Sequence, residues 1–117
     1  MPARHYRVTR GDDYRRIVRT GSRVGGAYSI TYVVPHSFKG EEHTPVRFGY
    51  IISKAVGNAV TRNLVRRRMK SITDELIAEG ECCHDVVFRA LPAAATCSYA
   101  ELRREVLSSY AKLRART

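Results

Sequence analysis

The pattern of hydrophobic and polar positions along the chain predicts three helices. Apolar residues recur at helical spacing in three segments, residues 10–20, 58–79 and 98–113. Each segment opens on a capping residue, Thr9, Asn58 or Ser98, and Gly21 and Gly80 end the first two. The inward face of the last helix is expected to carry Leu102, Val106, Tyr110 and Leu113.

Three further segments have the residue types of strands. Residues 27–34 and 46–53 are rich in β-branched and aromatic side chains that alternate along the chain, and residues 85–89 form a shorter strand of the same kind. The loop at residues 35–45 predicts that the first two strands pair as a hairpin. The element order α, β, β, α, β, α indicates one α+β domain over residues 1–117, a sandwich in which helices cover a small sheet.

The charge of the chain indicates a polyanionic partner. The 117 residues include 21 Lys and Arg against 11 Asp and Glu, a formal charge of +10, but 44% are hydrophobic, so the chain is not a disordered basic tail. No apolar run resembles a secretory signal or a membrane-spanning helix. Three cysteines without CxxC spacing favour a reducing cytoplasm.

The middle helix concentrates this charge on one side. Residues 54–70 hold six basic residues and no acid, whereas residues 71–85 hold five acids and no base. On a helical projection one polar arc carries Arg62, Asn63, Arg66, Arg67 and Lys70. The opposite, apolar arc carries Leu64, Val65, Met69, Ile72 and Leu76, interrupted by Arg68 and Glu75. Because stacked like charges repel each other, the polar arc favours phosphate binding over a merely solvated face.

Aromatic side chains are the second sign of a nucleic-acid partner. Rings on the first helix and on the strands could stack on unpaired bases: Tyr14, Tyr28, Tyr32, Phe48 and Tyr50. Strand aromatics are more often core residues, so we expect only one or two of these rings to contact nucleic acid.

The residues do not form a catalytic constellation. The acid pairs lie at a helix cap, in a loop and near a helix end, and no histidine has a motif around it. Zinc ligation by Cys82, Cys83, His84 and Cys97 is disfavoured, because adjacent cysteines are poorly placed to bind one tetrahedral ion. We therefore expect neither a catalytic residue nor a metal site in the protein itself.

Three functions stay open from the residues alone. The first is an RNA-binding subunit, and the second is another non-enzymatic binding module, such as a ribosomal, other ribonucleoprotein or duplex-DNA protein. The third is a cationic protein for anionic membranes, which is the weakest because the cationic arc does not face a broad exposed apolar strip.

The segment from Ser53 to Arg67, with the sequence SKAVGNAVTRNLVRR, closely resembles the signature of the protein subunit of bacterial ribonuclease P. Residues 13–21 and 98–113 are similar to the first and last helices of that family. Two positions depart from its pattern: Ala55 stands where a second lysine is common, and Leu64 stands where a second arginine is common.

The resemblance implies a fold of order αβββαβα with a left-handed βαβ crossover, and hence one more strand than the hydrophobic pattern predicts. It implies a protein that assists a catalytic RNA in removing the 5′ leader of precursor tRNA, with Mg²⁺ bound mainly by the RNA and none intrinsic to the protein. The expected partners are the catalytic RNA and the leader, not DNA or a membrane. Contacts to RNA from the basic helix and the loop before it are expected from Lys54, Asn58, Arg62, Asn63, Arg66, Arg67 and Lys70. The leader cleft is expected to be lined by Tyr14, Val18 and Tyr32.

Overall fold

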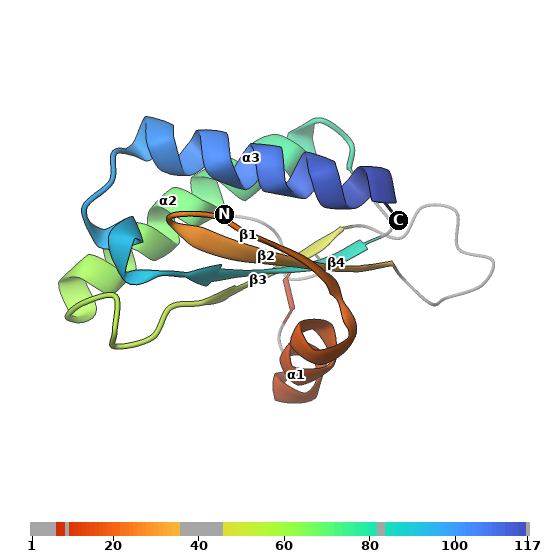
Figure 1. The fold of residues 1–117 in the computed structure, drawn as a ribbon, viewed down its shortest axis with the longest axis horizontal. Helices are drawn as coiled ribbons and strands as arrows, with labels where there is room; N and C mark the ends of the chain where they lie inside the picture. The colour runs from red at the N-terminus through yellow and green to blue at the C-terminus, as the bar shows by residue number, and fades with distance from the viewer. Residues whose placement is uncertain (1–6, 9, 36–45, 82–83, 117) are drawn as a thin grey trace.

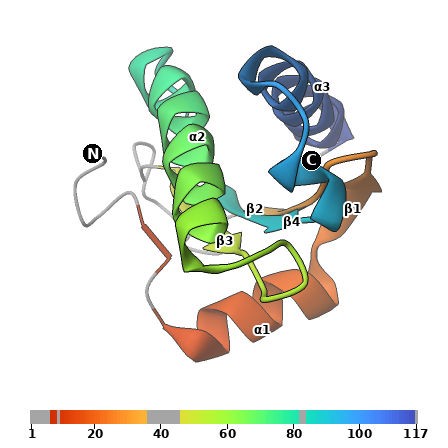
Figure 2. The same cartoon turned by 90° about the vertical axis from the view of Figure 1, so that its left-hand side faces the viewer.

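The computed structural model describes residues 7–8, 10–35, 46–81 and 84–116. In chain order the elements are α1 (Gly11–Thr20), β1 (Ser22–Gly25), β2 (Ser29–Pro35), β3 (Arg47–Ile51), α2 (Ala59–Ala78), β4 (His84–Ala90), the 3-10 turn η2 (Pro92–Ala95) and α3 (Tyr99–Arg116). They form three layers, because α2 and α3 cover one face of the sheet and α1 lies against the other (Figure 1, Figure 2). The order αβββαβα is confirmed. It includes β1, an edge strand that the hydrophobic pattern missed because three of its four residues are exposed.

The strands lie in the order β1-β2-β4-β3. β4 pairs antiparallel with β2 and parallel with β3, and α2 crosses over between the two parallel strands. The predicted hairpin of residues 27–34 and 46–53 is therefore wrong, since β4 lies between β2 and β3. The physical reason is that Val86, Val87 and Phe88 are all fully buried, so β4 is apolar on both faces, as a central strand has to be.

The alternation of side chains along β4 divides the core into two parts. Val86 and Phe88 point toward α2 and α3, where the rings of Phe48 and Tyr50 stack on Phe88 with centroids 6.0 and 6.5 Å away. Val87 points to the other face and packs with Ile17 of α1 in a smaller cluster. Phe48 and Tyr50 are thus core residues, whereas the face toward α1 has only one short helix to cover it.

The helix ends follow the predicted caps in two cases of three. Asn58 Oδ1 accepts a hydrogen bond from the backbone N–H three residues on, at 2.9 Å. Ser98 and Glu101 form a reciprocal capping box at 2.9 and 3.1 Å. The expected cap Thr9 lies outside the described residues, and the residue before α1 is Arg10, whose side chain makes no capping hydrogen bond. All four residues expected on the inward face of α3 are buried: Leu102, Val106, Tyr110 and Leu113.

Candidate nucleic-acid interface

Four of the predicted RNA-binding residues lie together along α2. A shallow groove of about 570 Å³ is lined by Val60, Asn63, Arg66, Arg67 and Lys70. Arg66 Nη1 donates to Asn63 Oδ1 at 3.0 Å, which aligns the two side chains one turn apart on the helix. Four of the five residues of the predicted polar arc therefore form one continuous surface, and we call Asn63, Arg66, Arg67 and Lys70 the α2 face.

The other three predicted residues of this region have different settings. Arg62 turns back toward the start of α2, where its Nε donates to the carbonyl oxygen of Gly57 at 3.1 Å. The Asn58 side chain caps the helix, so its amide oxygen already has a partner. Lys54 is exposed in the loop that joins β3 to α2. Arg62 and Asn58 thus fix the start of the α2 face, and Lys54 extends its charge into the loop.

Two of the acids that follow the basic segment, Glu75 and Glu81, pair with arginines of α3. Arg103 of α3 binds Glu75 with two hydrogen bonds of 2.8 and 2.9 Å, and this contact lowers the pKa of the Glu75 carboxyl. Glu81 pairs with Arg114, and its other oxygen accepts from the Tyr110 hydroxyl at 3.3 Å. Because these carboxylates hold α3 to the other elements, they do not neutralise the basic half of α2.

The apolar side of α2 departs from the prediction at two positions. Leu64, expected in the core, is 37% exposed, because α2 meets the rest of the fold along a narrower strip that includes Val65 and Met69. Arg68, which interrupted the apolar arc, is half-buried and donates from Nη1 to the Cys97 carbonyl oxygen at 3.0 Å. Arg68 therefore joins α2 to the segment before α3 and does not belong to the α2 face.

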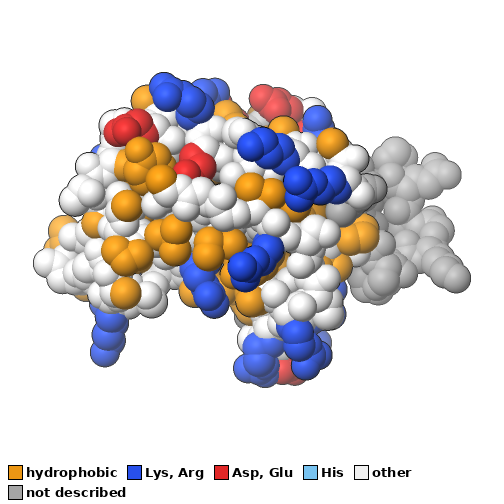
Figure 3. Space-filling model, in the orientation of Figure 1, with side chains coloured by type: hydrophobic (Ala, Val, Ile, Leu, Met, Phe, Trp, Pro, Cys, Tyr) orange, Lys and Arg blue, Asp and Glu red, His pale blue; other side chains and the backbone are white. Residues whose placement is uncertain are grey.

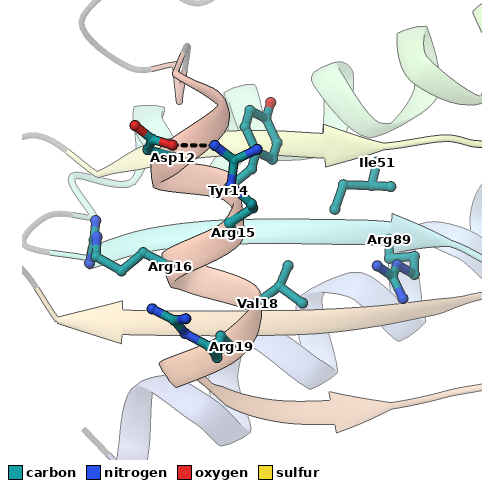
Figure 4. A pocket seen from close by; sticks show the side chains of 8 residues that line it. All are labelled: Asp12, Tyr14, Arg15, Arg16, Val18, Arg19, Ile51 and Arg89. Carbon is teal, nitrogen blue, oxygen red and sulfur yellow. Dashed lines mark hydrogen bonds and ion pairs between the residues drawn. The ribbon is translucent and has the colours of Figure 1, made fainter.

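A second basic site lies on the opposite side of the sheet. A cleft of about 610 Å³ opens between α1 and the strands (Figure 4) and is lined by Asp12, Tyr14, Arg15, Arg16, Val18, Arg19, Ile51 and Arg89. Four arginines thus face one aspartate, and basic side chains project from α1 on the surface (Figure 3). Tyr14, Val18 and Ile51 supply its apolar wall. A cleft of this composition fits a chain of phosphates with unpaired bases.

The position of Tyr14 in this cleft depends on a glycine of β3. A Cβ atom on Gly49 would lie 2.6 Å from the Tyr14 ring, so only glycine lets the ring approach the strand this closely. The Tyr14 hydroxyl accepts a hydrogen bond from the backbone N–H of Tyr50 at 3.3 Å. Tyr14 is half-buried, and of the rings considered for nucleic-acid contact it is the one that lines the cleft.

Tyr32 does not line the cleft as predicted. It is 2% exposed and packs with Val8, Ile17 and Val87 beneath α1. The guanidinium carbon of Arg89 lies 6.0 Å from the centre of the Tyr32 ring. The alternation of β2 placed Tyr32 on the correct face, but α1 covers that part of the face, so the ring supports a cleft residue from below.

A buried carboxylate at the start of β4 fixes α1 to the sheet. Asp85 is 3% exposed and accepts hydrogen bonds from Arg47 Nε and Nη2, both at 2.8 Å, and from Arg16 Nη2 of α1 at 2.9 Å. The hydrogen bond to Asp85 raises the pKa of the Arg47 guanidinium. Because Arg16 also lines the cleft, this ion cluster fixes the position of the cleft wall that α1 provides.

Sequence reasoning missed the cleft residues contributed by the strands and all three arginines that α1 places in the cleft, Arg15, Arg16 and Arg19. The alternation of β4 contained a signal, since Asp85, Val87 and Arg89 share one face, and an arginine there indicates a face that is open at one end. Ile51 at the end of β3 carried no signal of its own, because an apolar residue at a strand end is ordinary.

Two kinds of feature are absent from the part of the chain that the structure describes. Within residues 7–8, 10–35, 46–81 and 84–116, no three His, Cys, Asp or Glu side chains gather as metal ligands. Cys82 and Cys83 lie outside these ranges. No helix in the same ranges is long and apolar enough to cross a bilayer.

Comparisons with known proteins show the family to which the chain belongs. A sequence model of the Ribonuclease P family matches residues 1–114. The ribonuclease P protein component of Clavibacter michiganensis subsp. michiganensis is 42% identical over 93% of this chain and 93% of its own length. That of Kocuria rhizophila is 40% identical over 95% of this chain and 93% of its own length.

Solved structures show the same fold. The ribonuclease P protein of Staphylococcus aureus aligns with a TM-score of 0.78 at 24% identity, over 92% of this chain and 96% of that one. The protein from Thermotoga maritima aligns with a TM-score of 0.73 at 16% identity, over 87% of this chain and 92% of that one. The family match and the close relatives show that the chain belongs to the ribonuclease P protein family, whose members are components of a ribonucleoprotein endoribonuclease of tRNA processing.

Proposed function

We propose that the α2 face, together with Lys54, binds the catalytic RNA of ribonuclease P. The observation that carries this proposal is the segregation of charge: residues 54–70 hold six basic residues and no acid, and Glu75 and Glu81 pair with α3. A surface of this kind binds a phosphate backbone by releasing its condensed counterions. The proposed contacts are Lys54, Arg62, Asn63, Arg66, Arg67 and Lys70, with Asn58 holding the start of the helix.

The cleft beneath the sheet is proposed to bind the 5′ leader of precursor tRNA. A single strand offers both phosphates and unstacked bases, and the cleft offers arginines beside the half-buried ring of Tyr14 and the side chain of Val18. Residues 52–58 alone connect Ile51 in the cleft with the first turn of α2. This short connection keeps the leader close to the catalytic RNA.

The bond-breaking chemistry is assigned to the RNA. The described residues offer no cluster of ligands that fits the Mg²⁺ that the family implies. We expect Mg²⁺ to be held mainly by the RNA. The contribution of the protein is then to hold the leader and to place cations among the phosphates, which lowers the concentration of Mg²⁺ that the RNA requires.

Cleavage of precursor tRNA by the cognate catalytic RNA, with and without this chain, tests the proposal over a series of Mg²⁺ concentrations. The chain alone should cleave nothing, and its addition should increase cleavage most at low Mg²⁺. Binding of precursor and mature tRNA to the assembled holoenzyme should differ, with the precursor bound more tightly.

A matched pair of variants separates the α2 face from charge in general. Arg66→Ala removes one charge from the α2 face, and Arg104→Ala removes one from the exposed side of α3. Only Arg66→Ala should weaken assembly with the catalytic RNA. If the chain leaves cleavage at low Mg²⁺ unchanged, the proposed function is wrong. Equal affinity of the holoenzyme for precursor and mature tRNA would instead contradict the role of the cleft.

A further inference from the structure

One guanidinium in the cleft differs from its neighbours. Arg15 pairs with Asp12 and Arg16 pairs with Asp85, so both have carboxylate partners inside the protein. Arg89 has no carboxylate partner among the described residues. Among the described residues, the one charged or aromatic interaction of its guanidinium is with Tyr32, whose ring centre lies 6.0 Å from the guanidinium carbon.

The setting of Arg89 makes an unpaired charge costly. It lies between Ile30 on β2 and Ile51 on β3 in the register of the sheet, and it is half-buried. Arg19, by contrast, is exposed to water at the outer end of α1. A partly desolvated guanidinium between apolar neighbours gains most from an anion that enters the cleft, because the anion replaces the lost hydration.

A buried aromatic ring lies below the guanidinium of Arg89. Tyr32 is 2% exposed and packed under α1, so its ring is a fixed support below Arg89. Figure 4 shows Arg89 and Ile51 on the strands beside α1, across the cleft from Tyr14 and Val18. Placed over the ring, the guanidinium has its N–H groups in the fork geometry that matches the oxygens of a phosphate group.

We propose that Arg89 is a phosphate-binding residue of the cleft, which grips one phosphodiester group of the single-stranded RNA and so sets the register of the leader along α1. This inference rests on the proposed function of the cleft and adds to it a named contact and its chemical class. The bases beside that phosphate lie against Tyr14, Val18 and Ile51, whose apolar surfaces are tolerant of sequence. The register is therefore set by the backbone and not by base identity.

The test uses the holoenzyme of catalytic RNA and this chain, with precursor tRNAs that carry one methylphosphonate linkage at successive leader positions. Each such linkage removes one phosphate charge. With the unaltered chain, one position should weaken binding by about tenfold, the lower range for a charge-assisted hydrogen bond. Arg89→Met keeps an apolar stem over Tyr32. Its holoenzyme should bind the unmodified precursor more weakly by the same factor, and a methylphosphonate at the sensitive position should weaken its binding no further.

Several controls make the result decisive. Arg104→Ala on α3 should leave the full pattern of leader positions unchanged. Mature tRNA should bind the Arg89→Met holoenzyme as tightly as it binds the unaltered one. For precursor tRNA, the slope of log affinity against log salt should fall by about 0.7, the value for one phosphate of a single strand. If Arg89→Met does not fold, as judged by circular dichroism, Arg89→Gln provides the same measurement.

Two outcomes would overturn the inference, and they differ from each other. If the unaltered holoenzyme prefers precursor tRNA but Arg89→Met remains equally sensitive at every leader position, Arg89 does not bind a phosphate and the cleft keeps its proposed function. If the unaltered holoenzyme does not distinguish precursor from mature tRNA, the proposed function of the cleft fails and the inference fails with it.

Discussion

Replacement of Asp85 by Asn should loosen α1 from the sheet. The Asp85 carboxylate accepts three hydrogen bonds of 2.8 to 2.9 Å from Arg47 and Arg16. Asn has nearly the same shape, but one of its two terminal atoms is an NH₂ group, which cannot accept a hydrogen bond from a guanidinium. The substitution therefore removes the buried negative charge and leaves Arg16 and Arg47 with the carboxylate of Asp13, which lies 3.8 Å from each.

The size of the effect follows from the exposure of the two arginines. Loss of one partner from a fully buried ion pair costs about 3 to 5 kcal/mol. Here the Arg47 and Arg16 side chains are 26% and 41% exposed, so both can regain part of their hydration. We therefore expect Asp85→Asn to lower the free energy of unfolding by about 2 to 3 kcal/mol, which corresponds to roughly 8 to 12 °C in Tm for a domain of this size.

Urea unfolding followed by far-ultraviolet circular dichroism measures this loss, and hydrogen exchange of the α1 amides locates it. Asp12→Asn is the matched control, because Asp12 pairs with Arg15 on the exposed side of α1 and its loss should change stability by less than about 0.5 kcal/mol. A loss below about 0.5 kcal/mol for Asp85→Asn as well would refute the idea that this carboxylate holds α1 in place.

Three further predictions concern single substitutions. Arg66→Ala should weaken binding to the catalytic RNA and lower the slope of log affinity against log salt by up to about 0.7 to 0.9. Titration at several salt concentrations measures this slope, and an unchanged slope would show that Arg66 is not in the interface. Gly49→Ala should displace the Tyr14 ring, lower stability by about 1 to 3 kcal/mol in urea unfolding and weaken binding of precursor tRNA, while affinity for the catalytic RNA stays the same. The backbone N–H of Ser98, with further hydrogen bonds, lowers the pKa of the Glu101 carboxyl below 4.5 in the folded protein. The stabilisation of the fold by the ionised Glu101 carboxylate is therefore present above that pH and is lost as the pH falls through the folded-state pKa. Thermal unfolding from pH 6 to pH 3 should then lose stability less steeply in Glu101→Gln than in the unaltered chain.

Local signals in the sequence predicted the helices well. The caps at Asn58 and Ser98 and the spacing of apolar residues depend on neighbours within a turn or two, so they can be read without the fold. The α2 face was predicted for the same reason. The strand order could not be predicted, because pairing joins residues far apart in the chain and the sequence between β2 and β3 gave no sign that β4 would separate them.

The cleft shows a second limit of sequence reasoning. Tyr14 and Val18 were expected in the cleft from the resemblance to the ribonuclease P family, and both line it. Tyr32 and Arg89 lie on the same face of the sheet, yet α1 buries the first and leaves the second half-open. Alternation along a strand gives the face of a residue, but only the position of the covering helix decides which residues of that face remain accessible.

The central place of β4 in the sheet has a consequence for how the protein is made. β4 is the sixth element of the chain, and both strands that flank it precede it without touching each other. A chain that leaves the ribosome from its N-terminus therefore presents β2, β3 and the cationic helix α2 before the strand that unites them. The basic helix thus emerges before β4, and the cleft, whose floor includes Arg89, cannot form until residues 84–90 have been synthesised.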